Sequence, residues 1–194
     1  QYLSKLGMDT LGTLIRNLRK ERKLPLREVA GFLHMDQAIL SKIERGQRNI
    51  TKEQIIKLAD YFNPGEVAEI WITFPDPQLR ISKAKKRLTH PRFLRLYQHI
   101  LKPGGFIHLK TDSPGLYLFT KRVADMYDLT IIEDSGDVYA GDEIIPELSI
   151  KTHYESLDIA QSKKIHYLKF TLPGEIKNID EQLQKVLRHE EQLD

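Results

Sequence analysis

One aspartate stands between two prolines, directly ahead of a dense run of positive charge. The stretch FPDPQLRISKAKKRL begins at Phe74 and places Asp76 between the prolines. Five of the eight residues from Arg80 to Arg87 are lysine or arginine. Proline fixes its own φ angle and restricts the residue before it, so the backbone that carries the carboxylate is constrained. Two interpretations fit: a reactive carboxylate beside a polyanion-binding strip, or a capped turn beside a solvated loop.

The segments around Asp76 alternate between strand and helix patterns. A β-rich run, VAEIWITF, ends immediately before Pro75 and so places Asp76 at the end of a predicted strand. Further strands are predicted over 104–112, 129–134 and 165–173, and helices over 90–101, 115–128 and 178–193. Strands that alternate with helices predict a mixed or parallel α/β sheet. Ligands of such sheets bind beyond the carboxyl ends of the strands, which is where Asp76 is expected.

Residues 10–62 show only helical periodicity, in four short segments, and the helix-breaking sequence FNPGE ends the last of them. This part is basic, because residues 1–62 carry 12 Lys and Arg against 7 Asp and Glu, while residues 63–194 carry 18 against 20. Net charge of +5 favours a polyanionic partner for the first part. We therefore predict an all-α domain over 1–62, a partial α/β domain over 63–174 and a C-terminal amphipathic helix over 175–194.

Within the helical part, LREVAGFLHMDQAILSKIERGQRN, which begins at Leu26, resembles the helix-turn-helix of Cro/cI-type repressors. Its matching features are Ala30 as the fifth residue of the first helix and LSKIERG at the end of the second. The resemblance implies that the second helix enters the major groove of double-stranded DNA. Gln37 could then pair with adenine and Lys42 with guanine or a phosphate. The residues expected to contact DNA are Gln37, Ala38, Ile39, Ser41, Lys42, Arg45 and Arg48, with Arg16 and Arg19 on phosphates. A helical scaffold with a solvated polar face is the alternative.

Four separated motifs of the α/β part resemble the C-terminal half of the tRNA (guanine-N7-)-methyltransferase family. The resemblance runs from about Val67 to Pro173. Its motifs are FPDP with the basic strip and KRLTHPRFL, then LKPGGFIHLKTD, IKTHYE and KIHYLKF. The implied fold is a class I methyltransferase-like sheet.

This resemblance implies transfer of a methyl group from S-adenosylmethionine to N7 of a guanine. N7 carries a lone pair and no proton, so no general base is needed, and Asp76 would stabilise the positive charge near the ring and the donor. The expected tRNA-contacting residues are Arg80, Ser82, Lys83, Lys85, Lys86, Arg87, Asp112, Thr152, His153, Tyr154 and Glu155.

The methyl-donor site looks incomplete in this sequence. No glycine-rich turn follows a strand before residue 63, and the resemblance begins at what would be the fourth strand. The strand before Asp76 is then expected to have an open edge, covered by the N-terminal helices, the C-terminal helix, or a second copy or partner chain. We therefore predict a sequence-specific DNA-binding module attached to a truncated methyltransferase domain that is inactive alone. The alternatives are an active tRNA methyltransferase whose missing half comes from another chain or the full-length protein, and a non-catalytic RNA-binding remnant.

Composition excludes several other classes of protein. The chain contains no cysteine, which rules out disulfides, zinc–thiolate centres and thiol nucleophiles. Its longest apolar runs are far below the roughly 20 residues of a membrane span. His90, His108 and His166 lack the spacing of metal ligands, so we expect no metal site. A cytoplasmic location is expected.

Overall fold

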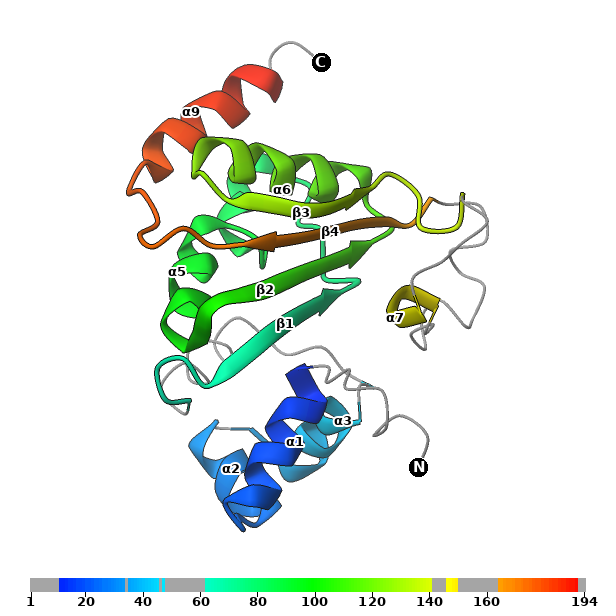
Figure 1. Cartoon of the computed structure of the whole chain (residues 1–194), viewed down its shortest axis with the longest axis vertical. Coiled ribbons are helices and arrows are strands. Elements are labelled where there is room, and N and C mark those ends of the chain that lie inside the picture. The colour runs from blue at the N-terminus through cyan, green and yellow to red at the C-terminus, as the bar shows by residue number, and fades with distance from the viewer. Residues whose placement is uncertain are drawn as a thin grey trace.

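A four-stranded mixed sheet forms the centre of the molecule (Figure 1). The computed structural model describes residues 11–33, 35–45, 47, 62–140, 146–149 and 164–191. The strand order is β1-β2-β4-β3, with β1 parallel to β2 and with β4 antiparallel to both β2 and β3. This arrangement confirms the predicted mixed α/β sheet. The strands are β1 (Val67–Thr73), β2 (Leu101–Thr111), β3 (Thr130–Ser135) and β4 (His166–Thr171).

Strand β2 begins earlier than predicted and is irregular at its start. Its partner on β1 changes from Leu101 opposite Val67 to Phe106 opposite Glu69, so extra residues of β2 bulge between them. Gly105 lies in this bulge, where an added Cβ would stand 2.8 Å from the carbonyl oxygen of Ala68. The KPGG sequence therefore forms a bulge within the strand, which begins at Leu101 and not at residue 104 as predicted.

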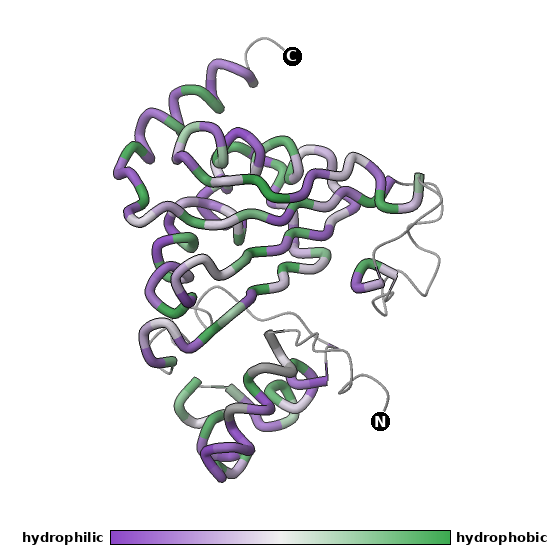
Figure 2. The backbone as a smooth tube through the Cα atoms, viewed as in Figure 1, coloured by the Kyte–Doolittle hydropathy of each residue, from purple (hydrophilic) through white to green (hydrophobic). Residues whose placement is uncertain are grey.

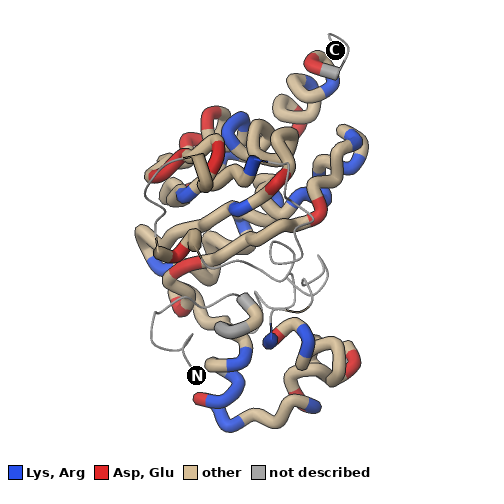
Figure 3. Tube along the Cα trace, turned by 90° about the vertical axis from the view of Figure 1, so that its right-hand side faces the viewer, with Lys and Arg blue, Asp and Glu red and all other residues tan. Residues whose placement is uncertain are grey.

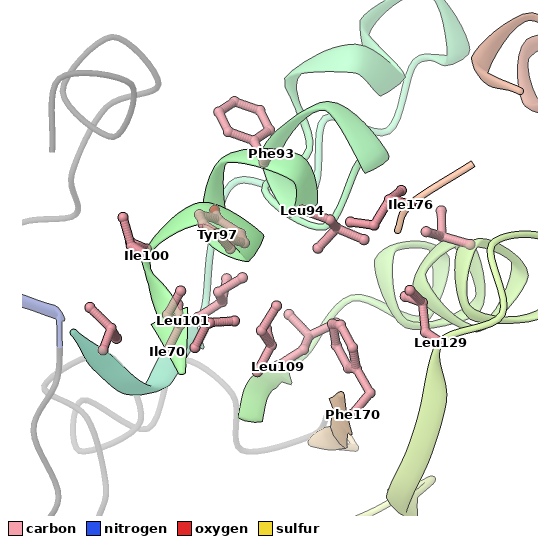
Figure 4. Close-up of a cluster of buried hydrophobic side chains, with 14 of the residues drawn as sticks. Ile70, Phe93, Leu94, Tyr97, Ile100, Leu101, Leu109, Leu129, Phe170 and Ile176 are labelled. Atoms are coloured by element: carbon pink, nitrogen blue, oxygen red, sulfur yellow. The ribbon is translucent and has the colours of Figure 1, made fainter. Parts of the chain in front are cut away.

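Helices α5 (Pro91–Ile100) and α6 (Pro114–Met126) cover one face of this sheet. Each begins at a side-chain cap followed by proline at the first helical position, a combination suited to a helix start. Their apolar side chains meet alternate residues of the strands, as the close-up in Figure 4 shows for α5. Figure 2 shows the matching alternation of hydrophobic and hydrophilic positions along the strands. Burial of this face supplies most of the apolar driving force of the fold. Its central members are Ile70, Phe93, Leu94, Leu109, Leu168 and Phe170.

The opposite face of the sheet carries polar and aromatic residues. Trp71 of β1 stacks on His108 of β2 with the ring centroids 3.8 Å apart. The Nδ1 atom of His108 lies 2.9 Å from the hydroxyl of Tyr167 on β4. Burial, reinforced by the positive charge of Lys169, lowers the pKa of His108 to about 3. The imidazole is therefore neutral near neutral pH and behaves as part of an aromatic row.

The C-terminal helix α9 (Asp180–Glu191) packs on the helical side of the sheet. Its first residue, Asp180, accepts hydrogen bonds from Arg95 at 2.7 and 3.0 Å and from the hydroxyl of Tyr127 at 2.9 Å. Leu183 and Leu187 are buried beneath the helix. The helix therefore lies away from the open edge of β1, and it is not the cover expected for that edge (Figure 1).

Three short helices precede the sheet: α1 (Leu11–Glu21), α2 (Leu26–Phe32) and α3 (Gln37–Glu44). They pack against one another, and their buried residues, which include Ile15, Leu40 and Ile43, belong to the same hydrophobic cluster as the core of the sheet. Gly12 touches α3 so closely that a Cβ would lie 1.9 Å from the carbonyl oxygen of Ile43. The helices themselves were predicted. The fourth expected helix lies outside the described residues, so a complete helix-turn-helix domain is not shown.

The same helices lie beside β1, whose pairing within the described part of the chain is with β2 alone (Figure 1). Arg22, just after α1, donates hydrogen bonds to both carboxylate oxygens of Glu66 at 2.6 and 2.8 Å. Of the segments that the sequence predicted as a cover for this edge, the N-terminal helices are the ones that lie next to it. None of the described helices combines the length and apolar character that a membrane span needs.

Candidate functional site

Asp76 lies in an unusual loop at the carboxyl end of β1. Phe74 and Gln78, on either side of it, have positive φ angles of 45° and 46°. Asp76 is exposed, and its carboxylate accepts hydrogen bonds from the backbone N–H of Gln78 at 3.0 Å and from the Gln78 side-chain amide. The carboxylate therefore does cap a turn, as one interpretation held. It also stays open to solvent at the strand end, as the other requires.

A second carboxylate follows the neighbouring strand. Asp112 comes directly after β2 and is half-buried, one residue before Ser113, which caps α6. Because β1 and β2 are parallel, their carboxyl ends meet at one edge of the sheet. The backbone N–H of Phe74 also donates to the carbonyl of Lys110 at 2.8 Å, which fastens the start of the Asp76 loop to β2. Asp76 and Asp112 thus share one end of the sheet.

The basic strip forms the 3₁₀ helix η2 (Ile81–Lys86). Ala84 is fully buried and Ile81 partly so, which turns the other residues of the short helix outward. Within the part of the chain that the structure describes, none of the exposed cations of this strip forms an ion pair. In Figure 3, where Lys and Arg are blue, several blue segments lie close together beside the sheet. The exposed members are Arg80, Ser82, Lys83, Lys85 and Lys86.

Arg87, the last cation of the strip, lies apart from the others. Its side chain is 5% exposed, and its guanidinium donates to the carbonyl oxygens of Pro77, Gln78 and Leu79. The guanidinium carbon lies 4.3 Å from the ring centre of Phe119 on α6. Burial lowers the pKa of Arg87 from its usual high value. Arg87 therefore faces the protein interior. The resemblance had instead implied that this side chain contacts tRNA.

The remaining predicted tRNA contacts, Thr152 to Glu155, lie outside the described residues. Helix α7 (Pro146–Ser149) ends three residues before them. The Nζ atom of Lys110, which is buried, donates to the carbonyl of Leu148 in α7 at 3.0 Å. Sequence reasoning missed Lys110. The available signal was a lysine in the interior of a predicted strand, between Leu109 and Thr111.

The residues predicted to contact DNA lie on and beside α3. Gln37, Ala38, Lys42 and Arg45 are exposed, Ile39 and Ser41 are half-buried, and Arg48 falls in a segment that the structure does not describe. Arg19 points inward and forms a two-pronged ion pair with the buried Glu44, at 2.7 and 2.9 Å. Arg16 is exposed.

Comparison with known proteins shows which family this chain belongs to. The model of a family described as "Putative methyltransferase" matches residues 35–168. The chain therefore belongs to this methyltransferase family. A relative from Alkaliphilus oremlandii, named tRNA (guanine-N(7)-)-methyltransferase, is 32% identical over 172 residues, which cover 84% of this chain and 77% of the relative.

Two relatives with the same printed name are more similar over a shorter stretch. The protein from Porphyromonas gingivalis is 44% identical over 133 residues, which cover 67% of this chain and 54% of the relative. The protein from Bacteroides thetaiotaomicron is 40% identical over 135 residues, which cover 69% and 53%. The chain thus spans about half the length of these two relatives.

These comparisons overturn the main functional prediction. The chain is not shown to be a DNA-binding module attached to a truncated methyltransferase, because the family match begins at residue 35, inside the segment assigned to DNA. An alignment over 84% of the chain must also include part of the N-terminal segment. Double-stranded DNA as the main partner is wrong as well, since the relatives are named for tRNA. Helical periodicity and positive charge specify short helices and affinity for polyanions, but they do not specify which nucleic acid binds.

Proposed function

We propose that this chain provides the tRNA-binding part of a tRNA guanine-N7 methyltransferase, with Asp76 next to the reacting base. The residues that complete the donor site come from another chain or from the full-length protein. The observation that supports this proposal is the placement of an exposed carboxylate at a strand end, beside exposed cations without ion pairs among the described residues. Membership of the methyltransferase family gives this placement its chemical meaning.

Guanine N7 is a suitable acceptor for a site of this composition. The nitrogen attacks through its lone pair, so the site needs no base to remove a proton. The ring becomes cationic as the new N–C bond forms, and a fixed carboxylate near the ring stabilises that charge. The hydrogen bonds from Gln78 hold the Asp76 carboxylate in place before the reaction.

Methyltransferase membership points to S-adenosylmethionine as the donor, which supplies an electrophilic methyl group. The exposed carboxylate of Asp76 fits the positive charge of a sulfonium. On the substrate side, Arg80, Lys83, Lys85 and Lys86 would contact tRNA phosphates, with Ser82, Asp112 and residues 152–155 nearer the base. We place the boundary between the helical segment and the α/β domain near residue 63, with the last unit starting near residue 175.

Removal of charge from the strip tests the tRNA proposal. A Lys83→Met, Lys85→Met, Lys86→Met variant is compared with wild type by tRNA binding across a range of salt concentrations. Each lost phosphate contact lowers the slope of log affinity against log salt by about 0.7 to 0.9, so the loss of three contacts should lower it by roughly 2 to 3.

A matched control removes three exposed charges elsewhere, by Arg16→Met, Lys20→Met and Lys102→Met. The control is expected to keep the wild-type slope. Equal weakening by both variants would show that tRNA binds to overall charge and not to the strip, which would contradict the proposal.

A further inference from the structure

The loop that presents Asp76 is strained. Phe74 and Gln78 both adopt left-handed backbone conformations that non-glycine residues rarely occupy. Each such residue costs roughly 1 to 2 kcal/mol relative to an ordinary conformation. A loop with two of them within five residues persists only if its surroundings hold it. Phe74 is held through its N–H on β2, whereas the Gln78 side of the loop needs a different anchor.

Arg87 is that anchor. It donates to three successive carbonyl groups, those of Pro77, Gln78 and Leu79, at 3.2 to 3.3 Å. A planar guanidinium presents several donors in a fixed fork, which a lysine ammonium cannot reproduce. Its flat face is covered by the ring of Phe119. A buried cation requires such partners, so the carbonyls and the ring together make the inward position stable.

The backbone of Arg87 is itself fixed. Its N–H donates to the carbonyl of Ala84 in η2 at 3.0 Å, and its carbonyl accepts from the N–H of His90 at 3.0 Å, just before α5. One residue therefore connects the strip that carries the exposed cations to the loop that carries Asp76. A displacement of either segment would therefore shift the other through Arg87.

We propose that Arg87 is a positioning residue, which holds the Asp76 loop in its strained conformation and does not bind a tRNA phosphate. This role rests on the proposed function, since it concerns where Asp76 stands relative to the reacting guanine. It also gives the strip two separate tasks. Arg80, Lys83, Lys85 and Lys86 face solvent and attract the polyanion, while Arg87 faces the protein and aligns the carboxylate.

Three single variants separate positioning from phosphate binding. Arg87→Ala removes the fork, Arg87→Lys keeps the charge without the fork, and Lys86→Ala removes the adjacent exposed cation as the matched control. The salt dependence of tRNA binding is measured for each. We expect the wild-type slope for both Arg87 variants and a slope lower by about 0.7 to 0.9 for Lys86→Ala.

Amide hydrogen exchange at Gln78 provides the second measurement, because this N–H donates to Asp76. Loss of hydrogen bonds to a charged group is expected to speed its exchange by at least about tenfold in Arg87→Ala and in Arg87→Lys. The amides of Leu109 and Phe170 in the sheet should keep their protection. Free guanidinium ion at millimolar concentration should restore protection in Arg87→Ala, whereas it should leave a merely destabilised variant unchanged, because it is far too dilute to denature.

Either of two results would overturn the proposal: a lower salt slope for Arg87→Lys than for wild type, or unchanged exchange at Gln78 in that variant. If Arg87→Ala unfolds, the sheet amides will lose protection together with the loop amides. The Arg87→Lys variant then decides the question. If no variant of the strip alters tRNA binding, the proposed function fails, and the exchange at Gln78 still tests the role of Arg87.

Discussion

The N-terminal helices and the sheet region differ in how their parts are held together. In the helices α1 to α3, short helices that follow one another along the chain pack together, and a buried ion pair joins Arg19 to Glu44. In the sheet region, the central contacts join segments far apart in sequence, such as Arg95 with Asp180 and Arg87 with Phe119. Local sequence patterns predict the helices and strands of both regions, but they do not predict the long-range contacts of the sheet region. A functional site becomes recognisable only where distant segments converge.

The largest expected effect lies in the sheet region. Phe93→Ala leaves a large cavity beside α5, because Phe93 is fully buried. A loss of about 3 to 5 kcal/mol in the free energy of unfolding is expected from urea denaturation. Leu118→Ala on α6 is the control, since Leu118 is 61% exposed. A similar loss for both variants would show that burial does not dominate this region.

The buried ion pair of the N-terminal helices gives the next effect. Glu44→Gln removes the negative charge that faces the largely buried Arg19 guanidinium. We expect a loss of roughly 2 kcal/mol in the local stability of α1 and α3, measured by amide exchange in these helices. Sheet amides should change little. Equal loss of protection in the sheet would show that the two regions unfold as one unit.

The pH dependence of stability should arise in the sheet region. Burial lowers the pKa of His90 to about 4 and that of His108 to about 3. An unfolded histidine has a pKa near about 6.5, so the unfolded chain binds more protons below that pH. Stability is therefore full above about pH 6.5 and falls by up to about 1.4 kcal/mol per pH unit for each histidine as the pH drops toward 4.

The His90→Asn variant tests how much His90 contributes to this pH dependence. Asparagine keeps a side-chain cap for α5, as the imidazole Nδ1 does for the N–H of Arg92, but it does not titrate. Urea midpoints at pH 7 and pH 5 should show a smaller acid-induced loss than in wild type. An unchanged loss would place the titrating groups elsewhere.

The smallest effect is expected at the link between the two regions. Arg22 and Glu66 are both partly exposed, so their ion pair is screened by solvent. Arg22→Ala should lower the free energy of unfolding by under about 1 kcal/mol. A loss as large as that of Phe93→Ala would show that the regions depend on this contact.

The sequence predicted much of the fold and part of the site. The alternation of strand and helix patterns predicted the sheet, and Asp76 was placed correctly at the end of its strand. The inward turn of Arg87 was not predictable, because its partners are backbone carbonyls and a ring 32 residues away, which periodicity does not report. The N-terminal helices were predicted, but DNA as the partner was inferred from charge and local pattern alone.

The most direct test concerns Asp76 in the protein that carries both this site and the donor-binding residues. Labelled S-adenosylmethionine and tRNA are supplied, and the nucleosides of the product are separated. We predict N7-methylguanosine from wild type, and about a hundredfold lower rate for Asp76→Asn with unchanged tRNA affinity, since a fixed charge at the reacting group is lost. Equal rates for the two proteins, or label at another nucleoside, would contradict the account.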